Sequence, residues 1–579
     1  MKHRIYILTF LCSLILFSCS DEYLNKEPLS DVTEESFFQK SSDLELYTNG
    51  FYRMFPEASV YNGDERAGEI ITTNLSEEMR SARLIPTSGG GWNWDYLRDI
   101  NYFLEHYEKC DDENAKKHYS GVARFFRAYF YFDKLKRFGD VPWYDYTIDP
   151  TDTESLQKPR DSRQFVTDKI IEDLDYAIAN LNDETQAYRI TKYSALALKS
   201  RVGLYEGTYE KYRNIDGYEK FLQASADASL MLMDDSPYTI YSTGDTMHDY
   251  MNLFNAHDAE TSEMILSRQF TQTVAVDHNV NYYTTTSSYG RPGMPKELVN
   301  SYLMNDGSRF TDQANYNAIF FLEEVANRDP RLSQTIRTPG YTRKGETMEI
   351  APNLGATTTG YQLTKYVTEP VYDTNDESIT DLPILRFGEV LLNYAEAKAE
   401  LGTISQTDLD NSIQQLRNRV GMPGLSMAEA NSNPDPFMAE QYPTVTGANK
   451  GLILEIRRER RIELYMENHR WDDIVRWKSG QTITNPLRGM YFPGPGNYDL
   501  DGDDNTDVVL FEGEEPGGQT EGIQYIELGS DIFLDENNLV DPQPDFNNRT
   551  FDEERDYLYP IPRVELQLNP NLTQNPGWE

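Results

Sequence analysis

Two stretches of the chain combine aromatic rings with amide and hydroxyl groups. Three glycines at 89–91 lead into Trp92, Asn93 and Trp94, and residues 282–289 hold three tyrosines among five threonines and serines. Proteins bind a sugar by stacking a ring on its C–H face and by hydrogen-bonding its hydroxyls. We expect the glycines to form a flexible loop that presents the Trp92 ring to a ligand. Trp94 directly precedes a helical pattern and is predicted to lie in the core.

A run of acidic residues around a glycine has the spacing of a calcium-binding loop. Asp499, Asp501, Asp503 and Asp507 place carboxylates at intervals around Gly502. Calcium takes about six to eight oxygen ligands, and one such loop can supply several of them. Two interpretations stay open, a structural Ca²⁺ held by these four aspartates and a solvated acidic turn. No cofactor that the function requires is predicted.

The sequence carries no recognisable catalytic motif. The seven histidines are scattered, none has HExxH spacing, and no motif for a serine or cysteine nucleophile accompanies them. Among 95 acidic residues, two neighbouring carboxylates say little about catalysis. We predict that the protein is not an enzyme. The alternative, a surface glycoside hydrolase, requires two carboxylates about 5 to 10 Å apart in a cleft.

Charges of both signs alternate at helical spacing near residue 460. We interpret them as an ion-pair network that holds the last long helix to its scaffold, rather than as a catalytic pair. The residues are Glu459, Arg460, Glu463, Arg470, Asp472 and Arg476.

The first residues have the features of a bacterial lipoprotein signal. Lys2 and Arg4 precede an almost unbroken apolar run over 5–17, which is too short to cross a bilayer as a helix. Small Ser18 before Cys19 resembles a lipobox, in which the cysteine is lipidated, and acyl chains there would hold the protein on a membrane. The acidic residues that follow resemble the surface-export signal of Bacteroidetes lipoproteins. A soluble secreted protein cleaved nearby, and attachment to the opposite face of the outer membrane, are the alternatives.

The composition limits the kinds of ligand and partner that we expect the protein to bind. The 579 residues include 95 acidic and 54 basic ones, for a net charge of −41. This charge repels nucleic acid and anionic headgroups and suits a neutral or cationic ligand. After loss of the signal and use of Cys19 as the anchor, Cys110 is the only cysteine left for other chemistry, so the sequence predicts no disulfide within the chain and no thiolate metal site.

Helical periodicity occurs in two parts of the chain. Small and aromatic positions alternate between paired helices, as in tetratricopeptide-type solenoids. We therefore predict a mostly α fold, a tetratricopeptide-like helix-pair scaffold with a large irregular, loop-rich subdomain. The predicted helices span 43–55, 94–107, 118–138, 162–181, 191–212, 218–233, 385–401, 407–420 and 451–466.

The irregular stretches are too long to be simple connections, so we expect them to carry function. The predicted divisions are a signal at 1–18, an N-terminal helical region at 19–236, a loop-rich region at 237–380, a C-terminal helical scaffold at 381–480, and an irregular C-terminal region at 481–579.

Five groups of motifs, taken together and in this order, resemble the SusD/RagB family of surface glycan-binding lipoproteins of Bacteroidetes. The resemblance covers essentially the whole chain. The motifs are FRAY at 126–129 with RFGDVP at 137–142; PKELV at 295–299 with DG at 306–307 and RDPRL at 328–332; LRFGEVLLNYAEA at 385–397; RRERRIEL at 457–464 with RWDDIVRW at 470–477; and YPIP at 559–562 with NPNLTQNPG at 569–577.

The resemblance implies a non-catalytic protein that sits as a lid on a SusC-like TonB-dependent outer-membrane transporter, captures oligosaccharide at the cell surface and delivers it to that barrel. It also implies that ligand contacts come from loops in the early and middle regions. On position and composition we select Tyr61, Arg80, Trp92, Asn93, Tyr283 and Tyr289 as candidates. A lipoprotein that binds peptide or another nutrient, or a purely structural lid, is the alternative.

Overall fold

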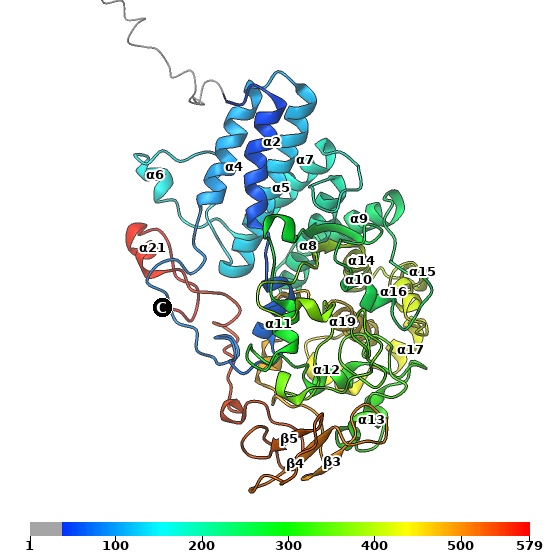
Figure 1. Cartoon of the computed structure of the whole chain (residues 1–579). Coiled ribbons are helices and arrows are strands. Elements are labelled where there is room, and N and C mark those ends of the chain that lie inside the picture. The colour runs from blue at the N-terminus through cyan, green and yellow to red at the C-terminus, as the bar shows by residue number, and fades with distance from the viewer. Residues whose placement is uncertain (1–36) are drawn as a thin grey trace, which may run out of the picture.

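The computed structural model describes residues 37–579 and is mostly helical, as the sequence predicts (Figure 1). The predicted signal and Cys19 lie outside the described residues. No helix within residues 37–579 is long and apolar enough to span a membrane. The longer helices are α2 (Ser41–Asn49), α4 (Asp95–His106), α5 (Glu113–Phe138), α7 (Arg163–Asn180), α8 (Lys192–Lys211), α9 (Glu219–Asp235), α14 (Phe387–Leu401) and α19 (Lys450–Glu463).

These helices pack in series as antiparallel pairs. α5 contacts α7, α7 contacts α8, α8 contacts α9, and α14 lies against both α9 and α19. Helices α8 and α9 approach each other closely, since a Cβ atom on Gly203 would lie 2.6 Å from the Phe221 carbonyl oxygen. The Oγ atoms of Ser200 and Ser229 are 2.7 Å apart across the same contact. Small residues therefore set the helix spacing.

Local sequence signals place several helix ends. Thr191 caps α8 through a bond from the Ser194 amide, and α14 ends at Gly402 with φ of 75°, both as predicted. The side chain of Asp112 accepts from the amides of Asn114 and Ala115, so α5 begins at Glu113, five residues before the predicted start. The helix predicted over 407–420 is broken into α15 (Gln406–Asp410) and α16 (Ile413–Arg419).

The two irregular regions contain short elements. Strand β1 (Met264–Arg268) pairs antiparallel with β2 (Leu382–Arg386), which joins the loop-rich region to the start of α14. Strand β4 (Val508–Phe511) lies antiparallel to β3 (Gly496–Tyr498) and parallel to β5 (Gln524–Glu527). The short helices are α3 (Ser59–Asn62), α6 (Thr153–Leu156), α10 (Asp249–Phe254), α11 (Val280–Thr285), α12 (Lys296–Ser301), α13 (Phe321–Glu324), α17 (Met427–Ser432), α18 (Pro436–Gln441), α20 (Arg470–Arg476) and α21 (Arg563–Leu568).

Two large apolar clusters form the core. One is built on the helix pairs and takes in residues from Phe38 to Ile561. The other lies under the loop-rich region, where Tyr250, Tyr302 and Tyr361 are fully buried. Residues of α19 contribute to both clusters, so this helix lies at their junction.

The predicted ion-pair network is present, and it is buried rather than solvated. Glu463 at the end of α19 accepts from Arg331 (3.1 Å), Arg386 (3.0 Å) and Arg419 (2.6 Å), which come from three separate segments. Arg331 also binds Glu459, at 2.5 Å. Burial raises the pKa of Glu463, but the charges of the three arginines outweigh it and hold the pKa at about 2.

Replacing Glu463 with glutamine is expected to destabilise the fold by about 3 to 5 kcal/mol, because three buried guanidinium groups lose their shared counter-charge. The measurement is the free energy of unfolding in urea. The matched control is Glu172→Gln, which breaks an exposed pair with Lys169 and should cost at most about 1 kcal/mol. Equal losses in the two variants would contradict a dominant role for the buried network.

The lowered pKa of Glu463 also predicts how the unfolding free energy depends on pH. A glutamate whose pKa falls from 4.5 to about 2 on folding contributes stability that is fully present above pH 4.5 and is lost as the pH falls toward 2. The difference in unfolding free energy between the wild-type protein and Glu463→Gln should therefore shrink between pH 5 and pH 3. A difference that stays constant over this interval would show that Glu463 does not titrate in this way.

Candidate ligand-binding site

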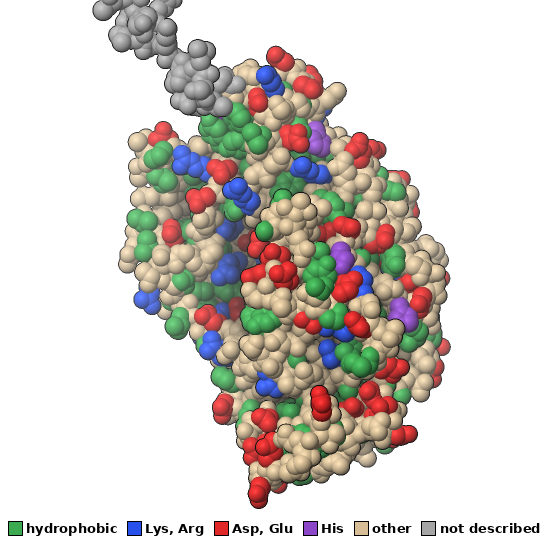
Figure 2. Space-filling view, in the orientation of Figure 1, with side chains coloured by type: hydrophobic (Ala, Val, Ile, Leu, Met, Phe, Trp, Pro, Cys, Tyr) green, Lys and Arg blue, Asp and Glu red, His purple; other side chains and the backbone are tan. Residues whose placement is uncertain are grey.

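A cleft of about 850 Å³, which we call the N-terminal cleft, lies between one face of α5, the start of α4 and the start of α20. Its wall includes Asn93, Tyr96, Tyr129, Lys136 and Asp472. Figure 2 shows a hollow between the lobe that carries α21 and the body of the molecule, and basic and hydrophobic side chains line it. The cleft therefore lies at the interface of three helices and the C-terminal segment.

A glycine turn shapes one edge of this cleft. Residues 89–91 all have positive φ (74°, 58° and 88°), a backbone that only glycine adopts readily. The Lys134 ammonium donates to the Gly91 carbonyl at 2.5 Å, and the Arg137 guanidinium donates to the Gly90 carbonyl at 2.8 Å. A Cβ atom on Gly91 would lie 2.6 Å from Arg137 Nε. The turn is thus fixed to α5, and the prediction of a flexible loop is wrong.

The turn directs Trp92 into the core, so the prediction that its ring is presented to a ligand is also wrong. Trp92 is 8% exposed and packs edge-on against Phe138 (4.9 Å between ring centres) and Trp94 (5.3 Å). Trp94, predicted to be a core residue, packs against the core while staying partly exposed.

Two predicted tyrosines are buried as well. Tyr61 is 1% exposed and Tyr283 is 3% exposed. Their rings lie 5.7 Å apart, and the Tyr283 hydroxyl donates to Glu65 at 2.5 Å. Neither ring has a free face for a sugar, and the expectation that they contact ligand is corrected.

The remaining predicted residues are accessible but do not form one group. Asn93 lines the N-terminal cleft, whereas Arg80 and Tyr289 are exposed outside its wall. Tyr289 is 43% exposed and stacks on Tyr282 at 5.5 Å with 22° between the ring planes. The stacked pair is a separate exposed aromatic surface.

Sequence reasoning missed the other residues of the cleft wall. Tyr96, at the first turn of α4, is 37% exposed, and Tyr129 shows part of its ring from α5. Helical periodicity could have identified them, since both tyrosines fall between the buried positions of an amphipathic helix. Trp471 and Tyr559 belong to the motifs at 470–477 and 559–562, and they line the same cleft with little exposure.

One ion pair and several hydrogen bonds to neutral acceptors hold the charged side chains of the N-terminal cleft. Lys136 forms a 2.8 Å ion pair with Asp472, and the Arg137 guanidinium lies 3.9 Å from the centre of the Tyr559 ring. Burial lowers the pKa of Lys134 to about 8. The wall carries four cations (Arg66, Lys134, Lys136 and Arg137) and two carboxylates (Asp133 and Asp472). Beside them it offers ring surface and the Asn93 amide, which suit a hydroxyl-rich molecule.

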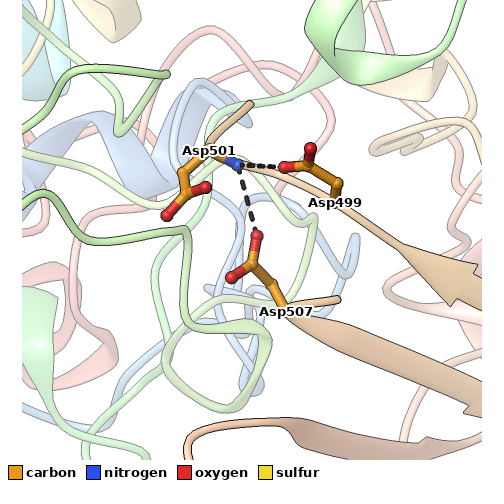
Figure 3. Close-up of side chains that lie close together, drawn as sticks. All are labelled: Asp499, Asp501 and Asp507. Carbon is orange, nitrogen blue, oxygen red and sulfur yellow. Dashed lines mark hydrogen bonds between the residues drawn. The ribbon is translucent and has the colours of Figure 1, made fainter. Parts of the chain in front are cut away.

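The acidic loop brings three of its four predicted aspartates together. Carboxylate oxygens of Asp499, Asp501 and Asp507 lie within 4.8 Å of one another (Figure 3). The Asp501 amide donates to Asp499 (3.1 Å) and to Asp507 (3.3 Å), so backbone bonds orient two of the carboxylates. Asp503 lies outside this group, and its carboxylate accepts from Asn505. Three convergent carboxylates can supply part of the oxygen shell that Ca²⁺ needs.

Comparisons with known proteins agree over nearly the whole chain. Residues 253–578 match the model of the SusD family, and residues 22–204 match a model described as "Starch-binding associating with outer membrane". A SusD-like protein P2 of Formosa agariphila is 24% identical, over 99% of both chains.

Two solved structures from Bacteroides fragilis share the fold. A SusD-like protein superposes with a TM-score of 0.68 at 22% identity, over 95% of this chain and all of the other. A protein described as a SusD-like carbohydrate binding protein gives 0.69 at 20% identity, over 93% of this chain and all of the other. With a family model that matches more than half of its length, this chain belongs to the SusD family.

Proposed function

We propose that this protein binds an oligosaccharide at the outer membrane of its cell and delivers it to a SusC-like TonB-dependent transporter. Membership of the SusD family supports this, as does one structural neighbour that is described as a carbohydrate binding protein. The match of residues 22–204 to a model described as starch-binding and associating with the outer membrane supports the location. Lipid attachment at Cys19 and exposure at the cell surface are part of the proposal.

The observation that carries the binding proposal is the N-terminal cleft. It offers the partly exposed rings of Tyr96 and Tyr129 beside the Asn93 amide, while its basic groups are engaged by neighbouring atoms of the wall. A sugar stacks on the faces of aromatic rings and forms hydrogen bonds without carrying a net charge. Because each such contact contributes little net free energy, we expect weak to moderate affinity with little dependence on salt.

No part of this proposal needs a catalytic step. The cleft does contain acidic groups, and Asp472 is among them, but that carboxylate is held by Lys136 as an ion pair. A glycosidase needs two carboxylates that flank the scissile bond, one of which protonates the leaving oxygen. We therefore propose capture and release of intact oligosaccharide.

Affinity electrophoresis of residues 20–579 against polysaccharides tests the binding site. We expect retardation by one glycan class and a loss of affinity of about tenfold in Tyr96→Ala, because removing one stacking ring costs roughly 1.4 kcal/mol. The matched control is Tyr146→Ala, since Tyr146 is 41% exposed and lies outside the cleft wall.

Other outcomes of that experiment have distinct meanings. Binding that is unchanged in Tyr96→Ala and lost in Tyr289→Ala would move the site to the stacked pair of Tyr282 and Tyr289. A folded protein that no glycan retards, and that binds peptides, would contradict the proposed ligand class.

We also propose that the acidic loop holds a structural Ca²⁺ through Asp499, Asp501 and Asp507. Burial, followed by the nearby charge of Asp507, raises the pKa of Asp501, so the loop carries mutual repulsion that a cation would relieve. The alternative is a solvated turn that its backbone hydrogen bonds hold without metal.

Thermal unfolding with calcium and with EDTA tests this site. At a hundredfold excess over its Kd, Ca²⁺ should stabilise the wild-type protein by about 2.7 kcal/mol and raise its Tm by a few degrees. The shift should disappear in Asp501→Asn and persist in the control Asp503→Asn, whose carboxylate lies outside the group. Equal melting temperatures with and without calcium in the wild-type protein would support the solvated turn.

A further inference from the structure

A second cleft, which we call the polar cleft, is larger than the N-terminal cleft. Its volume is about 1320 Å³, and its wall is built from α12, α18, the segment that follows α8 and the segment that follows α20. None of its lining residues lines the N-terminal cleft. Neither the family match nor the N-terminal cleft assigns a role to the polar cleft.

The basic groups of the polar cleft are mostly satisfied by the protein itself. Each of three lysine or arginine side chains in the wall forms a short ion pair, and the exposed acids Asp216, Glu440 and Glu536 disfavour an anionic ligand. The pairs are Lys296 with Glu324 at 2.6 Å, Lys211 with Glu400 at 2.7 Å, and Arg488 with Asp535 at 2.6 Å.

Two buried amide groups in this wall have an atom with no hydrogen-bond partner. Asn300 and Gln441 are each 6% exposed, and the unpartnered atoms are Asn300 Oδ1 and Gln441 Nε2. The orientation of Gln441 is fixed, because Arg461 can only donate and its guanidinium binds Gln441 Oε1 at 2.9 Å. Arg461 also binds Ser301 of α12 at 3.3 Å, which ties the two helices that carry the amides.

Asn300 carries an unpaired acceptor and Gln441 an unpaired donor, and both residues line one cleft. The two atoms themselves are buried, so a ligand reaches them only when neighbouring side chains move aside. A buried polar group left without a partner costs about 1 to 3 kcal/mol, so a ligand that supplies both bonds gains this energy. A sugar hydroxyl donates and accepts at the same time, and neighbouring hydroxyls on one ring repeat this capacity.

The aromatic residues of the wall favour a sugar over a peptide. Tyr316 and Phe437 are partly buried and meet edge-on, with ring centres 6.5 Å apart and 81° between their planes. Ring surface beside amides and the hydroxyls of Thr444 and Thr446 is the combination that carbohydrate requires.

We propose that the polar cleft is a second carbohydrate-binding site, which takes a neutral oligosaccharide through Asn300, Gln441 and the rings of Tyr316 and Phe437. The site is separate from the N-terminal cleft, so a ligand bound in one cleft leaves the other accessible. This inference does not depend on the N-terminal cleft being a glycan site.

Crystals of residues 20–579 soaked with laminarihexaose, maltohexaose, cellohexaose, xylohexaose and mannohexaose, one at a time, test the site directly. We expect density for at least one of these glycans in the polar cleft, with a hydroxyl within hydrogen-bond distance of Asn300 Oδ1 or Gln441 Nε2. An empty polar cleft in every soak overturns the inference, whether or not the N-terminal cleft is filled.

Calorimetry with the glycan seen in the crystal separates the two sites in solution. In a Tyr96→Ala background, binding should persist, and adding Tyr316→Ala or Asn300→Ala should weaken it at least about tenfold. Adding Tyr146→Ala instead is the control and should change nothing. Tyr316 is partly exposed, so its variant reports on binding even if loss of Asn300 perturbs folding.

Two calorimetric results would overturn the proposal. One is binding that is abolished by Tyr96→Ala alone, which would leave a single site in the N-terminal cleft. The other is that tryptic casein peptides bind in the polar cleft while none of the five hexasaccharides binds there. That result would identify the cleft as a peptide site.

Discussion

The fold depends on one buried carboxylate and the arginines around it. Glu463 ends α19, the helix shared by both apolar clusters, and it receives Arg331 from the loop-rich region, Arg386 from the end of β2 and Arg419 from the end of α16. Removing charges from water is costly, and the cost is offset only when every charge is paired with good geometry. Segments that cannot align through regular secondary structure are therefore brought into register by the position of one side chain.

The ion pairs of Glu463 explain how a long irregular region can be part of a stable domain. Between β1 and β2 the chain has only short helices and isolated bridges, yet some of its buried polar groups find partners in the scaffold. Lys365, for example, donates to Glu467 at 2.7 Å and to the Tyr465 carbonyl at 2.7 Å, just beyond α19. Side-chain pairing replaces the hydrogen-bond ladders that a sheet would provide. The walls of both clefts combine residues of the helical scaffold with residues of the irregular regions.

The sequence predicted what depends on local periodicity and failed where long-range packing decides. Helix α8 was predictable because Thr191 caps it and its apolar positions repeat, and the charges around Glu463 were recognisable from their alternation. The fate of Trp92 was not predictable. Whether a glycine turn exposes or buries the next ring depends on Lys134 and Arg137, which lie more than forty residues away along the chain. Asn300 and Gln441 likewise line one cleft on helices that Arg461 joins, and no spacing in the sequence encodes that arrangement.

The charge distribution explains why an acidic protein can present neutral binding surfaces. The chain carries a net charge of −41, and a field of that sign repels anions from a distance. Within the walls of the two clefts, however, Lys136, Lys296 and Arg488 are each paired with a carboxylate. Lys134 and Arg137 instead donate to backbone carbonyl oxygens, and these contacts fix the side chains that surround the amides and rings. Selectivity for a neutral, hydroxyl-rich molecule then follows from two effects that act at different ranges, repulsion of anions by the whole surface and hydrogen bonding by the few groups that the protein leaves unpaired.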